Sequence, residues 1–304
     1  GAVTRLALDA QGAHHIAYIS YNQFSQRLYY VTDQQNLDWQ TPVVLDSVNF
    51  PSPSSVALAV DAANRPHVTY CAQEPSTLQR QLRYTHFDGS QWINTQIANE
   101  ECWYASALAF DNQGILHTAF YSMAQDGASG VLKHGKLLNG AWAIDIVDDS
   151  ADAGRRLSLA LGSDDLAHIL YTHTPASQAA KKIDIAPSIK YAHQVAGQWQ
   201  VQATGVAQSD GGTGEMALAL DSADQPSFVY AAQNPAALVF AWRDRDAWRL
   251  SGIEQEAALL QGLALQIDSG GSPRVAYSLD KVQKYAVGRR VTLPAMLHFP
   301  LDSR

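Results

Sequence analysis

One pattern recurs six times along the chain, about every 50 residues, and it restricts the fold more than any other feature. Each copy opens with a short apolar segment that ends in Asp, or in Gly in the fourth copy: 6–9, 58–61, 108–111, 159–162, 218–221 and 265–268. Six residues further on stands a polar residue, which is His15, His67, His117, His168, Ser227 or Arg274. Because no copy has an insertion across this stretch, we predict two strands joined by a tight hairpin of fixed register.

Two further strands complete each copy. The third strand carries Tyr30, Tyr84, His134, Tyr191, Phe240 or Tyr285, and a Trp follows a polar turn in five copies: Trp39, Trp92, Trp142, Trp199 and Trp248. The sixth copy has Leu293 where the Trp is expected. Four strands per repeat of this length are typical of a propeller blade. Stacked blades bury both faces of every sheet, so we predict an all-β, six-bladed β-propeller with four antiparallel strands per blade.

The repeats cover nearly the whole chain, which we therefore interpret as a single propeller domain over residues 1–304. The expected blades are approximately 1–50, 51–102, 103–152, 153–212, 213–259 and 260–304. With 46% hydrophobic and 16% charged residues, the composition is that of a folded globular protein. We expect a monomer.

The unit Leu-Ala-Leu-Asp…Gly-x-x-His-Ile-x-Tyr…Leu-x-Tyr…Gly-x-x-Trp resembles the bacterial BNR-like or Asp-box-like propeller repeats. The resemblance implies the fold, which hosts many unrelated functions. Sialidases share a related turn, but here no Ser stands two residues before the Asp, and His or another polar residue replaces the Trp. Sialidases use an arginine triad and a Tyr–Glu pair, and three matching arginines cannot be placed in this sequence.

Net charge and hydropathy argue against two classes of partner, nucleic acids and membranes. The net charge is −8 and the basic residues are scattered, which argues against a nucleic-acid partner. No apolar run approaches the roughly 20 residues that a membrane span needs. The leading Gly1 resembles a cleavage scar, so we expect an extracytoplasmic protein, periplasmic or secreted.

The two cysteines, Cys71 and Cys102, are too few for a zinc site. The repeat places both near the same face of neighbouring blades. Either a disulfide or two buried free thiols fits this placement.

The repeated residues are interpreted as structural. Each His is expected to form a hydrogen bond within its own hairpin, each Asp to cap its turn, and each Trp to pack against the next blade. Aromatic residues between blades that stack on sugar rings, as in a lectin, are the alternative for the Trp row. We predict no metal site and no cofactor.

Residues that break the repeat are the better candidates for a ligand site. Loops from second to third strands and from blade to blade are expected to meet at one mouth of the central channel. The candidate ligand-binding residues there are Tyr21, Trp103, Tyr104, Tyr121, Arg155 and His173. An acidic cluster, Asp148, Asp149 and Asp152, is interpreted as a charged loop rather than a calcium site. An ordinary solvated rim is the alternative to a binding site.

Three functions follow, and no catalytic residue is assigned. The first is an exported, non-catalytic binding propeller with a glycan or protein ligand at the mouth. The second is a polysaccharide-degrading enzyme, either a glycoside hydrolase or a lyase; in a lyase, His173, Tyr121 and Arg155 would supply the base and the cation. The third is a scaffold domain without a small ligand.

Overall fold

The computed structural model describes residues 3–21, 26–34, 39–47, 55–74, 76–97, 101–123, 129–175, 187–207, 215–233, 236–255 and 260–288. All regular structure in these residues is β-strand, arranged in six antiparallel sheets. Five sheets have four strands, and the sixth has three within the described residues. The predicted fold class, a six-bladed β-propeller, is confirmed. The chain divides into two compact units, Gly1–Arg155 and Arg156–Arg304, and each is described by itself; that they form one domain stays a prediction.

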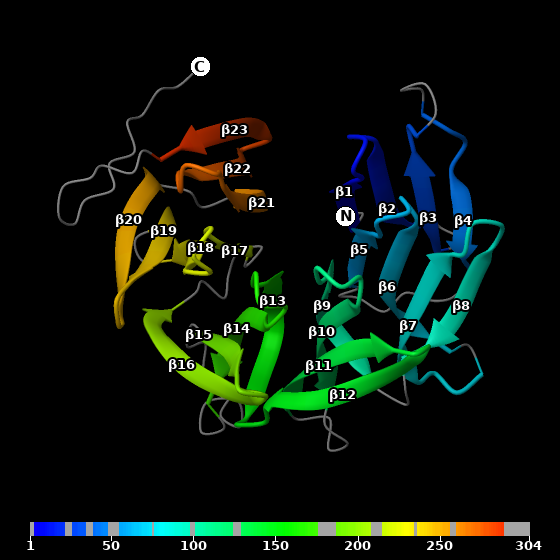
Figure 1. The fold of residues 1–304 in the computed structure, drawn as a ribbon, viewed down its shortest axis with the longest axis horizontal. Coiled ribbons are helices and arrows are strands. Elements are labelled where there is room, and N and C mark those ends of the chain that lie inside the picture. Colours follow the sequence, from blue (N-terminus) through cyan, green and yellow to red (C-terminus); the bar gives the residue numbers. More distant parts are fainter. Residues whose placement is uncertain are drawn as a thin grey trace. The chain divides into compact units, whose positions relative to one another are not determined.

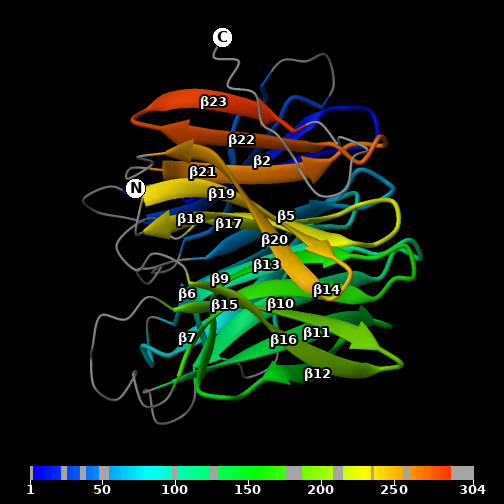
Figure 2. The same cartoon turned by 90° about the vertical axis from the view of Figure 1, so that its left-hand side faces the viewer.

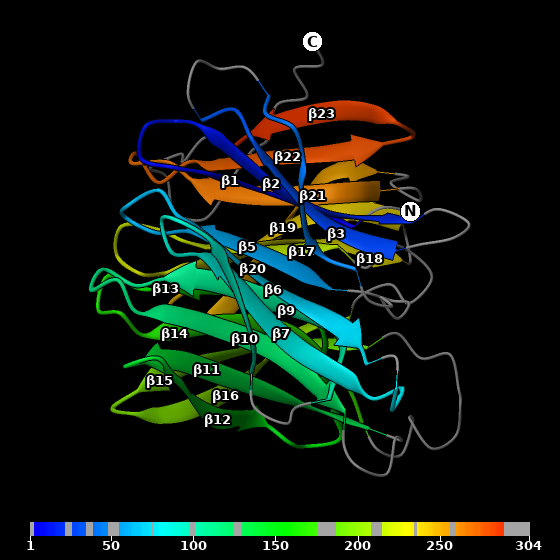
Figure 3. The ribbon, with the colours of Figure 1, turned by 90° about the vertical axis from the view of Figure 1, so that its right-hand side faces the viewer.

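The first unit holds three sheets whose strands follow one another in chain order (Figures 1 and 3). Their strands are β1 (Thr4–Leu8), β2 (His14–Tyr21), β3 (Gln26–Thr32), β4 (Val43–Asp46), β5 (Val56–Val60), β6 (Pro66–Gln73), β7 (Arg80–Phe87), β8 (Trp92–Gln96), β9 (Cys102–Phe110), β10 (Leu116–Met123), β11 (Gly130–Leu138) and β12 (Ala141–Asp148). The first strands of neighbouring sheets lie against each other, β1 on β5 and β5 on β9.

The second unit repeats this plan (Figure 2). Its sheets are β13 (Asp152–Leu161), β14 (Ala167–Thr174), β15 (Ser188–Val195) and β16 (Gln198–Ala207); β17 (Met216–Leu220), β18 (Pro226–Gln233), β19 (Ala236–Asp244) and β20 (Ala247–Gln255); and β21 (Leu260–Ile267), β22 (Pro273–Leu279) and β23 (Val282–Val287). The first residues of β13 belong to the first unit. Leu293, which the sequence places in a last strand, lies outside the described residues.

Each repeat turn is built around its Asp. In the first sheet, Oδ1 of Asp9 accepts hydrogen bonds from the backbone N–H groups of Gln11 and Ala13, at 2.9 and 2.8 Å. The N–H of Gly12 donates to the carbonyl of Asp9, with φ +83° at Gly12. A carboxylate that satisfies its own turn holds the hairpin without help from other strands, which explains why the spacing does not vary.

The histidine row lies inside the hairpins, as predicted. Nδ1 of His15 and the hydroxyl of Tyr30 share a 2.6 Å hydrogen bond, and Nε2 of His15 lies 3.4 Å from Asp9. His67 repeats the first contact with Tyr84 at 2.6 Å. Each set joins the first three strands of one sheet, so these histidines stabilise blades rather than converge on a metal.

The tryptophan row packs in the direction opposite to the prediction. Trp92 lies edge-on to Tyr30 of the preceding sheet, with ring centroids 5.0 Å apart, and Trp142 lies edge-on to Tyr84 at 5.5 Å. Side chains alternate between the two faces of a strand, and only the packed sheets show which face meets which neighbour. The apolar cores therefore lie between adjacent sheets of each unit.

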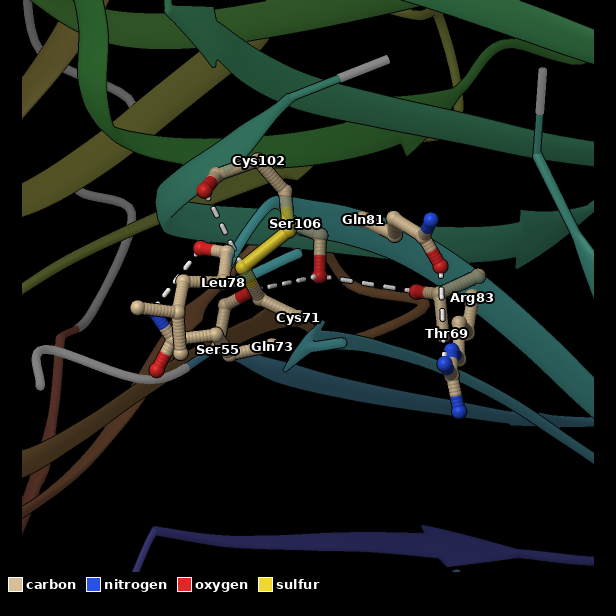
Figure 4. Close-up of a disulfide and its surroundings, with 9 residues drawn as sticks. All are labelled: Ser55, Thr69, Cys71, Gln73, Leu78, Gln81, Arg83, Cys102 and Ser106. Atoms are coloured by element: carbon tan, nitrogen blue, oxygen red, sulfur yellow. Dashed lines mark hydrogen bonds between the residues drawn. A yellow bond between two sulfur atoms is a disulfide. The ribbon is translucent and has the colours of Figure 1, made fainter. Parts of the chain in front are cut away.

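A disulfide joins Cys71 of β6 to Cys102 of β9 and so links the second and third sheets (Figure 4). The two Cα atoms are 5.7 Å apart, inside the range that a disulfide requires. Both cysteines are buried. For a sequence separation of 31, the loop-entropy estimate gives about 3–4 kcal/mol of stabilisation.

Among the described residues, no helix is long and apolar enough to cross a membrane.

Candidate functional site

Two of the predicted site residues, Tyr121 and Arg155, meet at one carboxylate. The hydroxyl of Tyr121, near the end of β10, donates to Oδ1 of Asp152 at 2.6 Å. Nε of Arg155 donates to Oδ2 of the same carboxylate. Tyr121 is buried and the Asp152 side chain is 2% exposed, whereas the Arg155 side chain is 41% exposed. We call these three residues the Tyr–Asp–Arg cluster.

A break in the strand brings Asp152 and Arg155 together. Residues three apart in a regular strand point to opposite faces. Gly154 lies between them with φ +97°, in the left-handed region that glycine adopts readily. This kink places both side chains on one side, where Arg155 reaches the carboxylate.

Gly130 makes room for the tyrosine. A Cβ at residue 130, the first residue of β11, would lie 1.9 Å from Cζ of Tyr121 and 2.3 Å from its hydroxyl oxygen. The phenol ring therefore occupies the space that any other residue would fill at this position.

The cluster occupies the same place in the repeat as the disulfide. Tyr121 and Cys71 each stand ten residues after the Asp of their own turn, Asp111 and Asp61. Each is joined to a residue 31 positions later, Asp152 and Cys102 respectively. A covalent bond forms one of these two contacts, and a hydrogen bond to a carboxylate that also binds Arg155 forms the other.

Other tyrosine–acid contacts belong to the regular repeat. Tyr70 donates to Asp46 at 2.8 Å, and Arg83 donates to the same carboxylate at 3.0 Å. In the second unit, Tyr277 and Lys284 meet Glu254 at 2.9 and 2.8 Å. Burial, and then the neighbouring carboxylate, raise the pKa of Tyr70 above its ordinary range. Because this arrangement recurs, we interpret it as structural.

Of the remaining predicted site residues, only His173 has a side chain within the described part of the structure. Tyr21 ends β2, and Trp103 and Tyr104 lie in β9, but their side chains are outside the described part of the structure. Trp103 is the register partner of Tyr121. His173 lies near the end of β14 in the second unit and is buried.

The acidic residues do not gather around one point. Asp148 accepts hydrogen bonds from the backbone N–H and the hydroxyl of Ser150, whereas Asp152 belongs to the Tyr–Asp–Arg cluster. Within the described residues, no group of three His, Cys, Asp or Glu side chains could hold a metal ion.

A pocket of about 530 Å³, which sequence reasoning missed, lies between the second and third sheets. It is lined by Arg65, His67, Tyr84, His86, Asp88, Thr95, Gln96, Leu137, Gly140, Ala141 and Trp142. The sequence feature that could have indicated this pocket is the Tyr-x-His pattern of the third strand, at 84–86 and again at 191–193. We call this cavity the inter-blade pocket.

Comparison with known proteins supports the fold and changes the expected function. No protein-family model matches the sequence, and no curated protein does. The chain is similar to a PL25 ulvan lyase structure with a TM-score of 0.62 at 13% identity, covering 92% of this chain and 78% of that chain. It is similar to the Penicillium chrysogenum α-L-arabinanase with a TM-score of 0.57 at 11% identity, covering 93% and 91%.

A leech intramolecular trans-sialidase is similar with a TM-score of 0.58 at 8% identity, covering 94% of this chain and 67% of that chain. The resemblance to sialidase-type propellers therefore holds at the level of fold. Most of the similar structures are glycoside hydrolases, sialidases or lyases. This finding contradicts the prediction of a non-catalytic binding propeller and favours its alternative, a polysaccharide-degrading enzyme.

Proposed function

We propose that this protein is a polysaccharide-degrading enzyme that acts on an acidic glycan, and that Arg155 binds a carboxylate of the substrate. The observation that carries the proposal is an exposed guanidinium fixed by the buried Asp152 and Tyr121. The fold neighbours support the class of reaction. The ulvan lyase among them was determined with a fragment that contains GlcA.

Arg155 suits this role because of how it is held. A guanidinium presents a planar fork of donors that matches a carboxylate. Asp152 accepts a hydrogen bond from Nε, and the Arg155 side chain is 41% exposed. A side chain that is already oriented loses less conformational entropy when a ligand binds.

The guanidinium of Arg155 suits both cleavage reactions, β-elimination and hydrolysis. In β-elimination, a cation on the uronate carboxylate stabilises the negative charge that develops when the neighbouring proton is removed. In hydrolysis, it orients the sugar, and two carboxylates perform the reaction. Tyr121 is buried and acts here through Asp152, so we assign it and Asp152 as positioning residues.

An extracytoplasmic location belongs to the proposal. The buried disulfide supports it, because disulfides form and persist in oxidising compartments.

The test is to incubate the purified protein with uronate-containing and neutral polysaccharides. Ultraviolet absorbance of an unsaturated uronate reports elimination, and new reducing ends without that absorbance report hydrolysis. We expect Arg155→Ala to raise KM roughly ten- to a hundredfold with a smaller change in kcat. Arg155→Lys and Tyr121→Phe are expected to raise KM less.

Arg249→Ala is the matched control, because Arg249 is an exposed arginine that pairs with Asp244 at 3.3 Å in the second unit. Absence of cleavage of every acidic polymer, or an Arg155→Ala variant that matches the wild type, rejects the proposal.

A further inference from the structure

The inter-blade pocket lies away from the Tyr–Asp–Arg cluster. Arg65 precedes β6 and His67 lies near its beginning, whereas Tyr121 stands near the end of the corresponding strand β10. The pocket is therefore at the Asp-turn end of the sheets, and the Tyr–Asp–Arg cluster is at the other end. Its volume, about 530 Å³, lies within the range of small-molecule sites.

Aromatic rings form one wall. His67, Tyr84 and His86 stack on one another, with centroids 5.1–5.9 Å apart and interplanar angles of 12–23°. Trp142 of the third sheet meets Tyr84 edge-on and is partly exposed. Flat ring faces beside polar groups are the surfaces on which the C–H face of a sugar ring packs.

Two ring nitrogens in this wall lack hydrogen-bond partners. Nδ1 of His86 is buried and has none. Nε2 of His67, a residue that is 8% exposed, lies 3.5 Å from Asp61, beyond a well-formed hydrogen bond. Asp61 itself is engaged by Nε of Arg65 at 2.7 Å. Both nitrogens are closed to solvent in this conformation, so a ligand hydroxyl group reaches them only when the imidazoles turn towards the pocket. Buried polar atoms without partners are costly in a folded protein, which favours that turn.

The charges at the pocket favour a neutral ligand. The guanidinium of Arg65 is offset by Asp61, and Asp88 adds a carboxylate at the rim. Burial lowers the pKa of His67 to about 4 and also lowers that of His86, so both imidazoles are neutral near pH 7.

We propose that the inter-blade pocket is a second carbohydrate site that binds a neutral sugar ring, packed against Trp142 and hydrogen-bonded by His67 and His86. The inference does not rest on the proposed function, because binding at this pocket requires no cleavage.

A twin cluster in the second unit provides a control. His193 stacks on both His168 and Tyr191, and Trp248 meets Tyr191 edge-on at 5.7 Å. Leu166 stands at the position that corresponds to Arg65, so this cluster lacks that guanidinium. Trp248→Ala therefore removes an equivalent packing contact without touching the inter-blade pocket.

The test is an array of neutral and acidic oligosaccharides, followed by calorimetric titration of the best neutral ligand. His86→Phe keeps the stacked ring but removes the unpartnered nitrogen. We expect this variant to fold at least as stably as the wild type and to bind about tenfold more weakly, which corresponds to about 1.4 kcal/mol. Trp142→Ala should abolish binding, and Trp248→Ala should leave the affinity unchanged.

Three results would overturn the proposal: no neutral oligosaccharide binds, His86→Phe binds as tightly as the wild type, or binding disappears when a chelator removes divalent metal. Cleavage of acidic polymers is measured separately on the same variants. Loss of one activity with retention of the other distinguishes the two proposals.

Discussion

At the scale of single residues, the position of Tyr121 depends on the missing side chain at residue 130. The phenol ring lies where a Cβ would stand, and its hydroxyl then reaches Asp152 at 2.6 Å. Asp152 in turn reaches Arg155 because Gly154 adopts a positive φ. Two glycines thus position the exposed guanidinium, one by leaving space and the other by its backbone conformation.

Gly130→Ala is expected to displace Tyr121 and to lower the free energy of unfolding by about 1–3 kcal/mol, as overpacking commonly does. The KM for an acidic polymer should rise, because Tyr121 no longer holds Asp152, the partner that fixes Arg155. Urea denaturation and steady-state kinetics measure the two effects.

Gly252→Ala is the matched control, since a Cβ at this strand position meets no atom within 4 Å. Its stability should change little or rise slightly. Equal stabilities for the two variants would contradict the assignment of Gly130.

At the scale of elements, the six turns share one geometry and differ in how the carboxylate is supplied. The fourth copy has Gly162 in place of Asp, and Asp164 of the same turn accepts the hydrogen bond from the N–H of Leu166 at 3.1 Å. Oδ1 of Asp224 accepts a hydrogen bond from the N–H of Ser163 at 2.8 Å, and Oδ2 accepts one from its hydroxyl at 2.5 Å. Two carboxylates, one from the same turn and one from the neighbouring blade, therefore hold this turn.

Restoring the repeat with Gly162→Asp should destabilise the protein. A Cβ at this position would lie 2.7 Å from Oδ1 of Asp164, 3.3 Å from Nε2 of His168 and 3.4 Å from Cγ of Asp224. The new carboxylate would therefore meet two others beside an imidazole that burial keeps neutral near pH 7. We expect a loss of about 1–3 kcal/mol, measured as the midpoint and slope of urea denaturation.

The double variant Gly162→Asp, Asp224→Asn removes one of the repelling charges and should recover part of the loss. Consensus substitutions often stabilise a protein. If Gly162→Asp were more stable than the wild type, Asp224 would not be a substitute for the missing Asp at residue 162.

At the scale of the whole molecule, buried histidines in several blades connect stability to pH. Burial lowers the pKa of His67 and of His168 from 6.5 to about 4, and that of His134 to about 3. In the unfolded chain these groups bind protons near pH 6.5, so between pH 6.5 and about 4 the unfolded state holds more protons than the folded state.

Acid is therefore expected to destabilise the protein well before the carboxylates titrate. Each of these histidines contributes stability that is complete above pH 6.5 and falls by up to about 1.4 kcal/mol per pH unit towards pH 4. Urea denaturation at half-unit steps from pH 7.5 to 4.5 measures the slope, and His67→Gln should reduce it. A flat profile over this range is incompatible with neutral buried imidazoles.

The fold could be predicted from sequence because its signals are local. The Asp of each turn, the residue with positive φ three positions later and the aromatic ring of the third strand lie within one short segment, as in Asp61, Asn64 and Tyr84. The candidate site stays a prediction. Tyr121 and Arg155 were identified as departures from the repeat, whereas the role of Asp152 and the inter-blade pocket depend on the packing of neighbouring sheets.

The sequence by itself determined the six sheets and their hairpin registers, since each turn is satisfied by its own residues, with an added carboxylate from the next turn at Ser163. Only the tertiary structure decided that Cys71 pairs with Cys102 and that Tyr121 pairs with Asp152. It also decided that Trp92, Trp142 and Trp248 face the preceding sheet. The physical reason is that these contacts join different sheets. Their geometry depends on how the sheets twist and stack, and no short-range spacing encodes that.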